Sequence, residues 1–319
     1  MKHSTFAIKT VFAAILASAI FLFSACNSEK TNIRFGSGNK GGLYDQFAAT
    51  FTAKFNSEHQ DLQILAKNTA GSAANIRLIE EGFIDLGIVQ ADILQDYLMR
   101  SRLVSAISAV AGLYTESIQI VVSADSDIQS VADLTGKKVS VGEEESGVLR
   151  NAEIILEAYG IALEKIDAKH LSFTNAASAL KAGEIDAFFC TAGIPTPSIS
   201  ELAASKSIRI LSLGQSDITR IMNLHPELTA SEIPAGTYPG QDSTIQTLGA
   251  KAVLVASQLL DSASVAKITA EVFAVGTQQT AGIPAGFHPG AAAFYKTNNL
   301  SVNVAAPLPG RGPIPSTGD

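Results

Sequence analysis

The chain of 319 residues carries 23 lysines and arginines against 30 aspartates and glutamates, a formal net charge of −7. This balance argues against a nucleic-acid partner, which requires a basic surface. The length is sufficient for two lobes of ordinary size.

Residues 1–26 have the pattern of a bacterial lipoprotein signal peptide. Lys2 and Lys9 form a basic start, an apolar run covers residues 11–23, and Cys26 closes the segment. The alternative, a short transmembrane anchor, is disfavoured because a spanning helix needs about 20 apolar residues. We therefore expect a periplasmic or extracytoplasmic protein, tethered to the membrane by a lipid on Cys26.

After this segment, apolar spacing and turn residues predict alternating strands and helices. The predicted strands cover residues 32–35, 62–66, 85–89, 117–123, 138–141, 185–190, 208–213 and 248–256. The predicted helices cover residues 43–56, 72–81 (capped by Ser72), 147–159, 174–182 and 263–273. This alternation predicts an α/β fold with parallel sheets and helices on both faces.

One sequence pattern occurs twice, at residues 79–90 and 180–191. Each copy contains an apolar residue, two further residues, a glycine (Gly82 or Gly183), one residue, then Ile-Asp and a mostly apolar run. The glycine is expected to take the left-handed conformation that ends a helix, with a buried strand following at once. Two copies in similar surroundings predict two lobes of related construction, with a cleft between them.

The sequence predicts five parts along the chain. They are the signal peptide 1–26, a first part of lobe I at 27–116, lobe II at 117–230, a crossover that completes lobe I at 231–300, and a disordered tail at 301–319. The tail is assigned on composition, since its prolines and glycines leave no apolar period.

The sequence makes no case for an enzyme, a cofactor or a metal. Residues 36–41 match the dinucleotide pattern G-x-G-x-x-G, but the following strand runs into Lys67 rather than the acidic residue that would hold a ribose. Neither a P-loop, nor H-E-x-x-H, nor G-x-S-x-G is present. Cys190 is expected to be a small core residue. The acidic run 143–145 is interpreted as a solvated turn, with calcium binding as the alternative.

Three loops of small polar residues lead into predicted helix starts, at residues 36–42, 69–72 and 145–147. Helix N-termini present unpaired N–H groups and favour carboxylates and other anions. Gln90 and Thr191 follow the two repeated strands and are expected at the same edge, where α/β sheets bind ligands. The alternative is that these loops only cap helices and form turns.

Several segments together resemble one family of receptors. The segments are Gly41-Gly42-Leu43-Tyr44, residues 69–75, residues 84–92, Leu113-Tyr114-Thr115-Glu116, residues 185–189, 193–197 and 237–242, and His288-Pro289-Gly290-Ala291-Ala292. In this order they resemble the TAXI-type solute receptors of tripartite ATP-independent periplasmic (TRAP) transporters. The resemblance covers residues 31 to about 297.

The resemblance implies a two-lobed periplasmic-binding-protein-like (type II) fold with a hinge and an interlobe ligand cleft. It implies capture of a small carboxylate or amino acid, glutamate-like, and delivery to the TRAP membrane subunits, with the receptor acting as a monomer. The implied ligand-binding residues are Gly41, Tyr44, Gly71, Ser72, Gln90, Asp92, Tyr114, Ser146, Gly147, Thr191, Thr196 and Tyr238.

Two departures and two alternatives accompany this interpretation. The region 275–287 is shorter than the family's, and Arg150 is displaced from the family's cleft position, so it is given no clamping role. One alternative is a receptor that senses a solute without a permease. The other is an exported enzyme on the same scaffold, which the missing catalytic motifs disfavour.

Overall fold

The computed structural model describes residues 30–100, 105–274 and 280–308. The predicted signal peptide 1–26 and its Cys26 therefore lie outside the described residues. Within the described ranges, no helix has the length and apolarity that crossing a bilayer requires.

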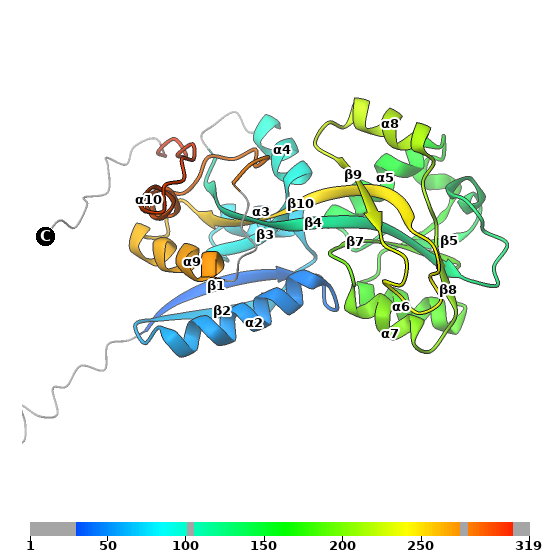
Figure 1. Cartoon of the computed structure of the whole chain (residues 1–319), viewed down its shortest axis with the longest axis horizontal. Helices are drawn as coiled ribbons and strands as arrows, with labels where there is room; N and C mark the ends of the chain where they lie inside the picture. The colour runs from blue at the N-terminus through cyan, green and yellow to red at the C-terminus, as the bar shows by residue number, and fades with distance from the viewer. Residues whose placement is uncertain (1–29, 101–104, 275–279, 309–319) are drawn as a thin grey trace, which may run out of the picture.

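A single mixed sheet of ten strands organises the described part of the chain (Figure 1). Its strand order is β2-β1-β3-β10-β4-β7-β5-β6, with β8 paired to β4 and β9 paired to β10. The prediction of parallel sheets is wrong for the centre, because β10 and β4 run antiparallel to each other and to β3 and β7 respectively. The pairs β1–β2, β1–β3, β5–β6 and β5–β7 are parallel, as expected.

The strands are β1 (Thr31–Gly38), β2 (Leu62–Asn68), β3 (Leu86–Gln90), β4 (Ile107–Ser123), β5 (Lys138–Ser140), β6 (Asp167–Lys169), β7 (Ala187–Ala192), β8 (Ile208–Ile210), β9 (Thr229–Ile233) and β10 (Ile245–Ser257). The helices are α2 (Leu43–Glu58), α3 (Ser72–Glu80), α4 (Ala91–Arg100), α5 (Gly147–Ala158), α6 (Phe173–Ala182), α7 (Pro197–Ala203), α8 (Gln215–Leu224), α9 (Ser262–Ala274) and α10 (Pro289–Thr297). Two short 3-10 turns, Val131–Leu134 and Leu163–Lys165, complete the list. The sequence did not predict α4, α7, α8, α10, β6 or β9.

Two separate hydrophobic cores divide this sheet into two lobes. The core of lobe I contains buried residues between Ile33 and Leu113 and between Ala252 and Tyr295. The core of lobe II contains buried residues between Ile118 and Ala250, including Cys190, which is fully buried as predicted. Residues 233–250 of the predicted crossover thus still pack into lobe II.

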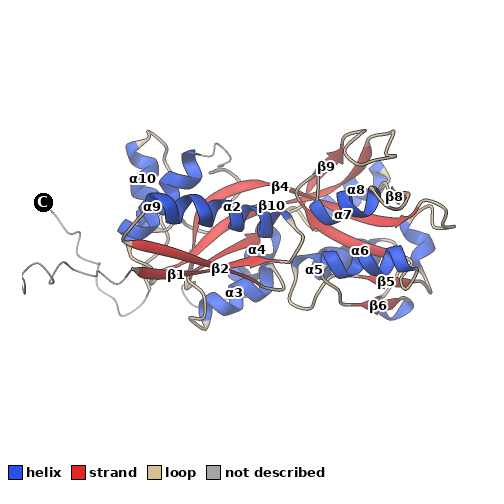
Figure 2. Ribbon diagram, turned by 90° about the horizontal axis from the view of Figure 1, so that it is seen from below, coloured by secondary structure: helices blue, strands red, loops and turns tan. Residues whose placement is uncertain are grey.

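The strands β4 and β10 connect the lobes. They lie side by side through the middle of the elongated molecule (Figures 1 and 2), paired from Ser117–Gly249 to Ile107–Ser257. The change of core falls between Leu113 and Ile118 on β4 and between Ala250 and Ala252 on β10. Two adjacent strands that leave one core and enter the other form the natural hinge of this fold.

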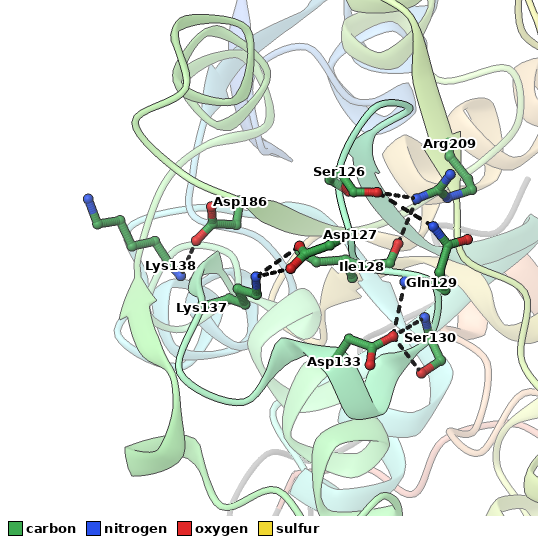
Figure 3. A network of polar contacts seen from close by, with 10 residues as sticks. All are labelled: Ser126, Asp127, Ile128, Gln129, Ser130, Asp133, Lys137, Lys138, Asp186 and Arg209. Atoms are coloured by element: carbon green, nitrogen blue, oxygen red, sulfur yellow. Dashed lines mark hydrogen bonds and ion pairs between the residues drawn. The ribbon is translucent and has the colours of Figure 1, made fainter.

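The repeated sequence pattern forms the same structure in both lobes. Gly82 and Gly183 take positive φ values of 74° and 75° after α3 and α6. The carboxylate of Asp85 then accepts the Arg34 N–H at 2.8 Å, and that of Asp186 accepts the Lys138 N–H at 2.7 Å (Figure 3). Each Asp therefore fixes the start of a buried strand, β3 or β7, against the first parallel strand of its lobe.

The prediction that residues 301–319 form a disordered tail is wrong for part of this segment. Phe287 donates its N–H to the Asn303 carbonyl at 2.7 Å, and Ala305 donates its N–H to the Phe287 carbonyl at 2.8 Å. Backbone hydrogen bonds therefore hold residues 303–305 against Phe287 despite the composition of this segment, and residues 309–319 lie outside the described part of the chain.

Candidate functional site

A cavity of about 30 Å³ lies between the two lobes at the hinge. It is lined by Asn39, Leu43, Tyr44, Ala70, Gly71, Ser72, Gln90, Glu116, Ser146, Gly147, Val148, Phe173, Thr191 and Ala192. Lobe I contributes the β1–α2 loop, the start of α3 and the end of β3. Lobe II contributes the starts of α5 and α6 and the end of β7. The small volume and the contacts below describe a closed arrangement of the lobes.

A buried carboxylate forms one wall of this cavity. Glu116 on β4 is 2% exposed, and Tyr44 donates its hydroxyl to the Glu116 Oε2 atom at 2.5 Å. Burial raises the pKa of Glu116 well above its ordinary value, and the nearby charge of Asp92 adds to the increase. Among the residues that the structure describes, no lysine or arginine lines the cavity. An ionised Glu116 therefore has no counter-charge inside the site, and its raised pKa favours the neutral carboxyl in the closed, ligand-free cavity.

A polar network beside the cavity joins the lobes. Asn151 on α5 is fully buried and donates its Nδ2–H to the Asp92 carboxylate at 2.8 Å. The Asn151 Oδ1 atom accepts hydrogen bonds from Gln90 Nε2 at 3.1 Å and from Thr191 Oγ1 at 3.0 Å. Burial raises the pKa of Asp92 to about 6. Gln90 and Asp92 belong to lobe I, so this network exists only while the lobes are together.

Two helices begin at the cavity. Ser146 caps α5 by accepting the Leu149 N–H at 3.1 Å. The predicted cap of α3 is wrong, because Gly71 holds the cap position and Ser72 is the first helical residue. The Ser72 hydroxyl instead accepts the Gln90 N–H at 3.0 Å. The first N–H groups of both helices lack intrahelical partners and give this end of the cavity a partial positive charge.

The structure brings seven of the implied ligand-binding residues to the cavity wall, namely Tyr44, Gly71, Ser72, Gln90, Ser146, Gly147 and Thr191. Five others do not line it. Asp92 lies behind it in the Asn151 network. The Tyr114 ring packs 6.5 Å from the Tyr44 ring, and within the described ranges its buried hydroxyl has no hydrogen-bond partner. Gly41 lies at the contact with α7, where its carbonyl accepts the Ser198 N–H at 3.4 Å.

Thr196 and Tyr238, the other two, belong to the interior of lobe II. Tyr238 donates its hydroxyl to Gln119 Oε1 at 2.6 Å and accepts the Thr196 N–H at 2.8 Å. Gln119 in turn donates to the Thr196 hydroxyl at 2.8 Å. These two residues therefore support the end of β7 rather than face the cavity.

Sequence reasoning missed Glu116, Asn151, Asn39 and Phe173 as site residues. Glu116 stands one residue from the predicted strand at 117, so extending that strand backwards would have placed it at the cavity. Asn151 follows Gly147 by four residues on one helix face. Asn39 and Phe173 meet only because the lobes are closed, with the Phe173 N–H donating to Asn39 Oδ1 at 3.2 Å.

In the described ranges, no three His, Cys, Asp or Glu side chains lie close enough together to hold a metal ion. These residues therefore give no support for a metal site. Arg150, which the sequence left without a role at the cleft, lies outside the cavity. Its Nε atom is 3.5 Å from the Asp96 carboxylate.

Solved structures with similar architecture cover most of the chain. A protein from Bordetella bronchiseptica RB50 matches with a TM-score of 0.54 and 16% identity over 88% of this chain and 86% of its own. The effector-binding domain of QuiR in complex with shikimate matches with a TM-score of 0.51 and 13% identity, over 78% and 98%. The alkanesulfonate-binding protein SsuA from Xanthomonas axonopodis pv. citri, bound to MOPS, gives 0.47 and 16%, over 85% and 92%.

At these identities the similarity concerns the fold, which is the two-lobed α/β fold of type II periplasmic binding proteins. Residues 35–278 match the family model described as NMT1-like, a span of most of the chain. The chain belongs to the NMT1-like family.

Proposed function

We propose that this protein is an extracytoplasmic receptor that captures a small amino acid or related carboxylate between its lobes. The observation that carries the proposal is the cavity itself, which joins a buried carboxylate to two helix N-termini across the hinge. The fold supports it, because binding proteins of this architecture close around small solutes by hinge bending.

The charge pattern favours a zwitterion over a dianion. Glu116 lies at one side of the cavity, and no cationic side chain from the described part of the chain lines it. An ammonium group of the solute would compensate the Glu116 carboxylate, while a solute carboxylate would accept N–H groups at the starts of α3 and α5. A dicarboxylate without an amino group would instead leave Glu116 without a cationic partner.

The mode of binding follows from the closed cavity. A volume of about 30 Å³ has room for little more than a water molecule. A solute such as an amino acid therefore enters when the lobes are apart, and β4 and β10 bend around it. Lobe closure then removes the solute from water and strengthens its polar contacts.

The resemblance to TAXI-type receptors supplies the remainder of the proposal. The receptor would deliver its solute to the TRAP membrane subunits as a monomer, held at the membrane by a lipid on Cys26. The discriminating experiment for delivery is uptake of labelled solute in cells with and without the receptor. Binding without any effect on uptake would favour a sensing receptor.

The first test is a thermal-shift screen of residues 27–319 against amino acids, dicarboxylates, oxo acids and sugars, followed by calorimetry. A ligand at a hundred times its dissociation constant stabilises the fold by about 2.7 kcal/mol. We expect the amino acids to give the largest shifts. Shifts from dicarboxylates or sugars alone would contradict the role of Glu116, and turnover of a bound ligand would contradict the receptor function.

A further inference from the structure

An acidic residue at the mouth of the cleft has a strained backbone. Glu145, directly before the α5 cap residue Ser146, has a φ of 59°. A non-glycine residue in this left-handed region carries a conformational cost and persists only where its surroundings hold it. The contacts that hold Glu145 in this conformation therefore indicate why the strained backbone is retained.

All the contacts found for Glu145 outside its own loop reach the opposite lobe. Its carboxylate accepts two hydrogen bonds from Arg77 on α3, from Nε at 2.7 Å and from the terminal guanidinium nitrogen at 2.8 Å. Its backbone carbonyl accepts the Ala74 N–H, also on α3, at 3.0 Å. Glu145 belongs to the loop of lobe II and α3 belongs to lobe I. Glu145 is thus an exposed turn residue, as the sequence predicts, but its carboxylate is paired with the other lobe rather than free in solvent.

A second ion pair crosses the same seam with its charges exchanged. Asp96 on α4 of lobe I lies 3.5 Å from the Nε atom of Arg150 on α5 of lobe II. Both pairs border a groove of about 430 Å³ between α3, α4 and α5, which Arg77, Asp96, Ser146 and Arg150 help to line. Each lobe therefore presents one cation and one anion to the other. A matched pattern of this kind has a single register in which both pairs form.

We propose that Glu145 and Arg77 form a clasp that holds the two lobes closed in the ligand-free protein, with Asp96 and Arg150 as its second element. The proposal rests on the two-lobed receptor function above. A bidentate guanidinium–carboxylate pair is the geometry in which a partly exposed ion pair contributes most. The clasp also positions the cavity, because Ser146 and the α5 N-terminus follow Glu145 directly.

The test measures the distance between the lobes without any ligand. Spin labels are attached at Ala53→Cys on α2 and Glu157→Cys on α5, both exposed positions, one in each lobe. In residues 27–319 the remaining native thiol, Cys190, is fully buried and does not compete for the label. Distance distributions by electron–electron double resonance are recorded at low ionic strength and in 0.5 M sodium chloride, roughly the range over which ion pairs are screened.

We expect a short distance in the unchanged protein at low salt. Glu145→Gln, which keeps the chain length and the backbone strain, is expected to reduce the ratio of closed to open molecules about fivefold. Arg77→Glu is expected to open the lobes further, and the exchange of both charges in Arg77→Glu with Glu145→Arg is expected to restore the short distance. Each variant is also checked for an unchanged far-ultraviolet dichroism spectrum.

The matched control is Asp127→Asn. Asp127 forms an exposed ion pair with Lys137 at 2.9 Å, but both residues lie in lobe II (Figure 3). This variant is expected to leave the distance unchanged. An unchanged distance in Glu145→Gln overturns the clasp, as does an already open unchanged protein at low salt. Since no solute is present, neither result bears on whether the cleft binds one.

Discussion

Asp85 and Asp186 make the same contact in the two lobes, 101 positions apart in the chain. Each carboxylate accepts the N–H of a residue in a neighbouring parallel strand, Arg34 of β1 at 2.8 Å and Lys138 of β5 at 2.7 Å. Each Asp also donates its own N–H to the carbonyl of that residue, both at 2.8 Å. The pair of bonds fixes the register of β1 with β3 and of β5 with β7. The two lobes are therefore built from one structural unit.

Replacing Asp186 by alanine is expected to destabilise the protein by about 1 kcal/mol, because the Lys138 N–H loses its charged acceptor. Asp186 is the better test position, since Asp85 also forms an ion pair with Arg34. Urea unfolding with the two lobes followed by separate probes gives the measurement. Asp186→Asn, which retains an oxygen acceptor, serves as the control and is expected to lose less. Equal stability of the alanine variant and the unchanged protein would contradict the role given to this contact.

The repeated unit was predictable because its determinants are local. A glycine that ends a helix, Ile-Asp, and an apolar run all lie within twelve residues, so the elements around Gly82 and Gly183 follow from the sequence. The loops at the ends of β3 and β7 were predictable for the same reason. Strand ends in an α/β sheet meet at one edge whatever the details of packing.

The central strands and part of the cavity wall depend on contacts between residues far apart in the sequence, so they could not be predicted from local patterns. The first part of β4, Ile107 to Leu113, contains Ser, Ala and Gly and has weak strand propensity. It becomes a strand because it pairs with β10 over its length. Asn39, Phe173 and Asn151 reach the site only when the lobes close, which no local pattern encodes. Ser72 was assigned as a cap by residue type, but its hydroxyl is used by the Gln90 N–H.

Replacing Glu116 by glutamine is expected to weaken binding of an amino acid roughly 30-fold, since a solute ammonium group would lose its charged partner. The fold is expected to remain, because glutamine still accepts the Tyr44 hydroxyl. Calorimetry with the best amino acid from the screen checks the affinity. Tyr44→Phe is the companion variant and keeps the Glu116 carboxyl group. An affinity unaffected by Glu116→Gln would place the ammonium group elsewhere.

We expect the titration of Asp92 to make the stability of the folded protein depend on pH. Its pKa is about 6 in the folded protein against an ordinary 3.8, because burial penalises the ionised form. Protonation of Asp92 therefore contributes its full stabilisation of the folded state below pH 3.8, and this stabilisation is lost as the pH rises toward 6. The difference of about two pH units corresponds to at most roughly 3 kcal/mol.

Asp92→Asn removes this titration while keeping an oxygen for the Asn151 Nδ2–H. The variant is therefore expected to be more stable than the unchanged protein at pH 8, with a difference that shrinks as the pH falls from 6 to 4. Thermal melts of both proteins across this range measure it, and the comparison cancels the contribution of other groups. A difference independent of pH would show that Asp92 does not titrate in this window.

Gly147 is the position where a side chain would prevent lobe closure. A Cβ atom there would overlap Gln90 Oε1 and lie 3.1 Å from the Ser72 hydroxyl, and both partners belong to lobe I. Gln90 cannot simply move aside, because it is buried and its amide donates to Asn151. Gly147→Ala is therefore expected to leave each lobe folded and to weaken ligand binding roughly 5- to 150-fold, which corresponds to the cost of about 1 to 3 kcal/mol that overpacking brings. Alanine inside α5 is itself favourable for the helix.

Gly214→Ala separates this effect from the general consequences of replacing a glycine. Gly214 also stands at the start of a helix in lobe II and has a φ of −69°. A Cβ atom there would lie 3.1 Å from the Asp217 carboxylate and 3.9 Å from the Ser216 hydroxyl, both in the same lobe. The Gly214→Ala variant is expected to bind the ligand with the same affinity as the unchanged protein. Scattering should show Gly147→Ala remaining extended in the presence of a ligand that compacts the control. Compaction of Gly147→Ala to the same radius would mean that the closed state does not require the contact between Gly147 and Gln90.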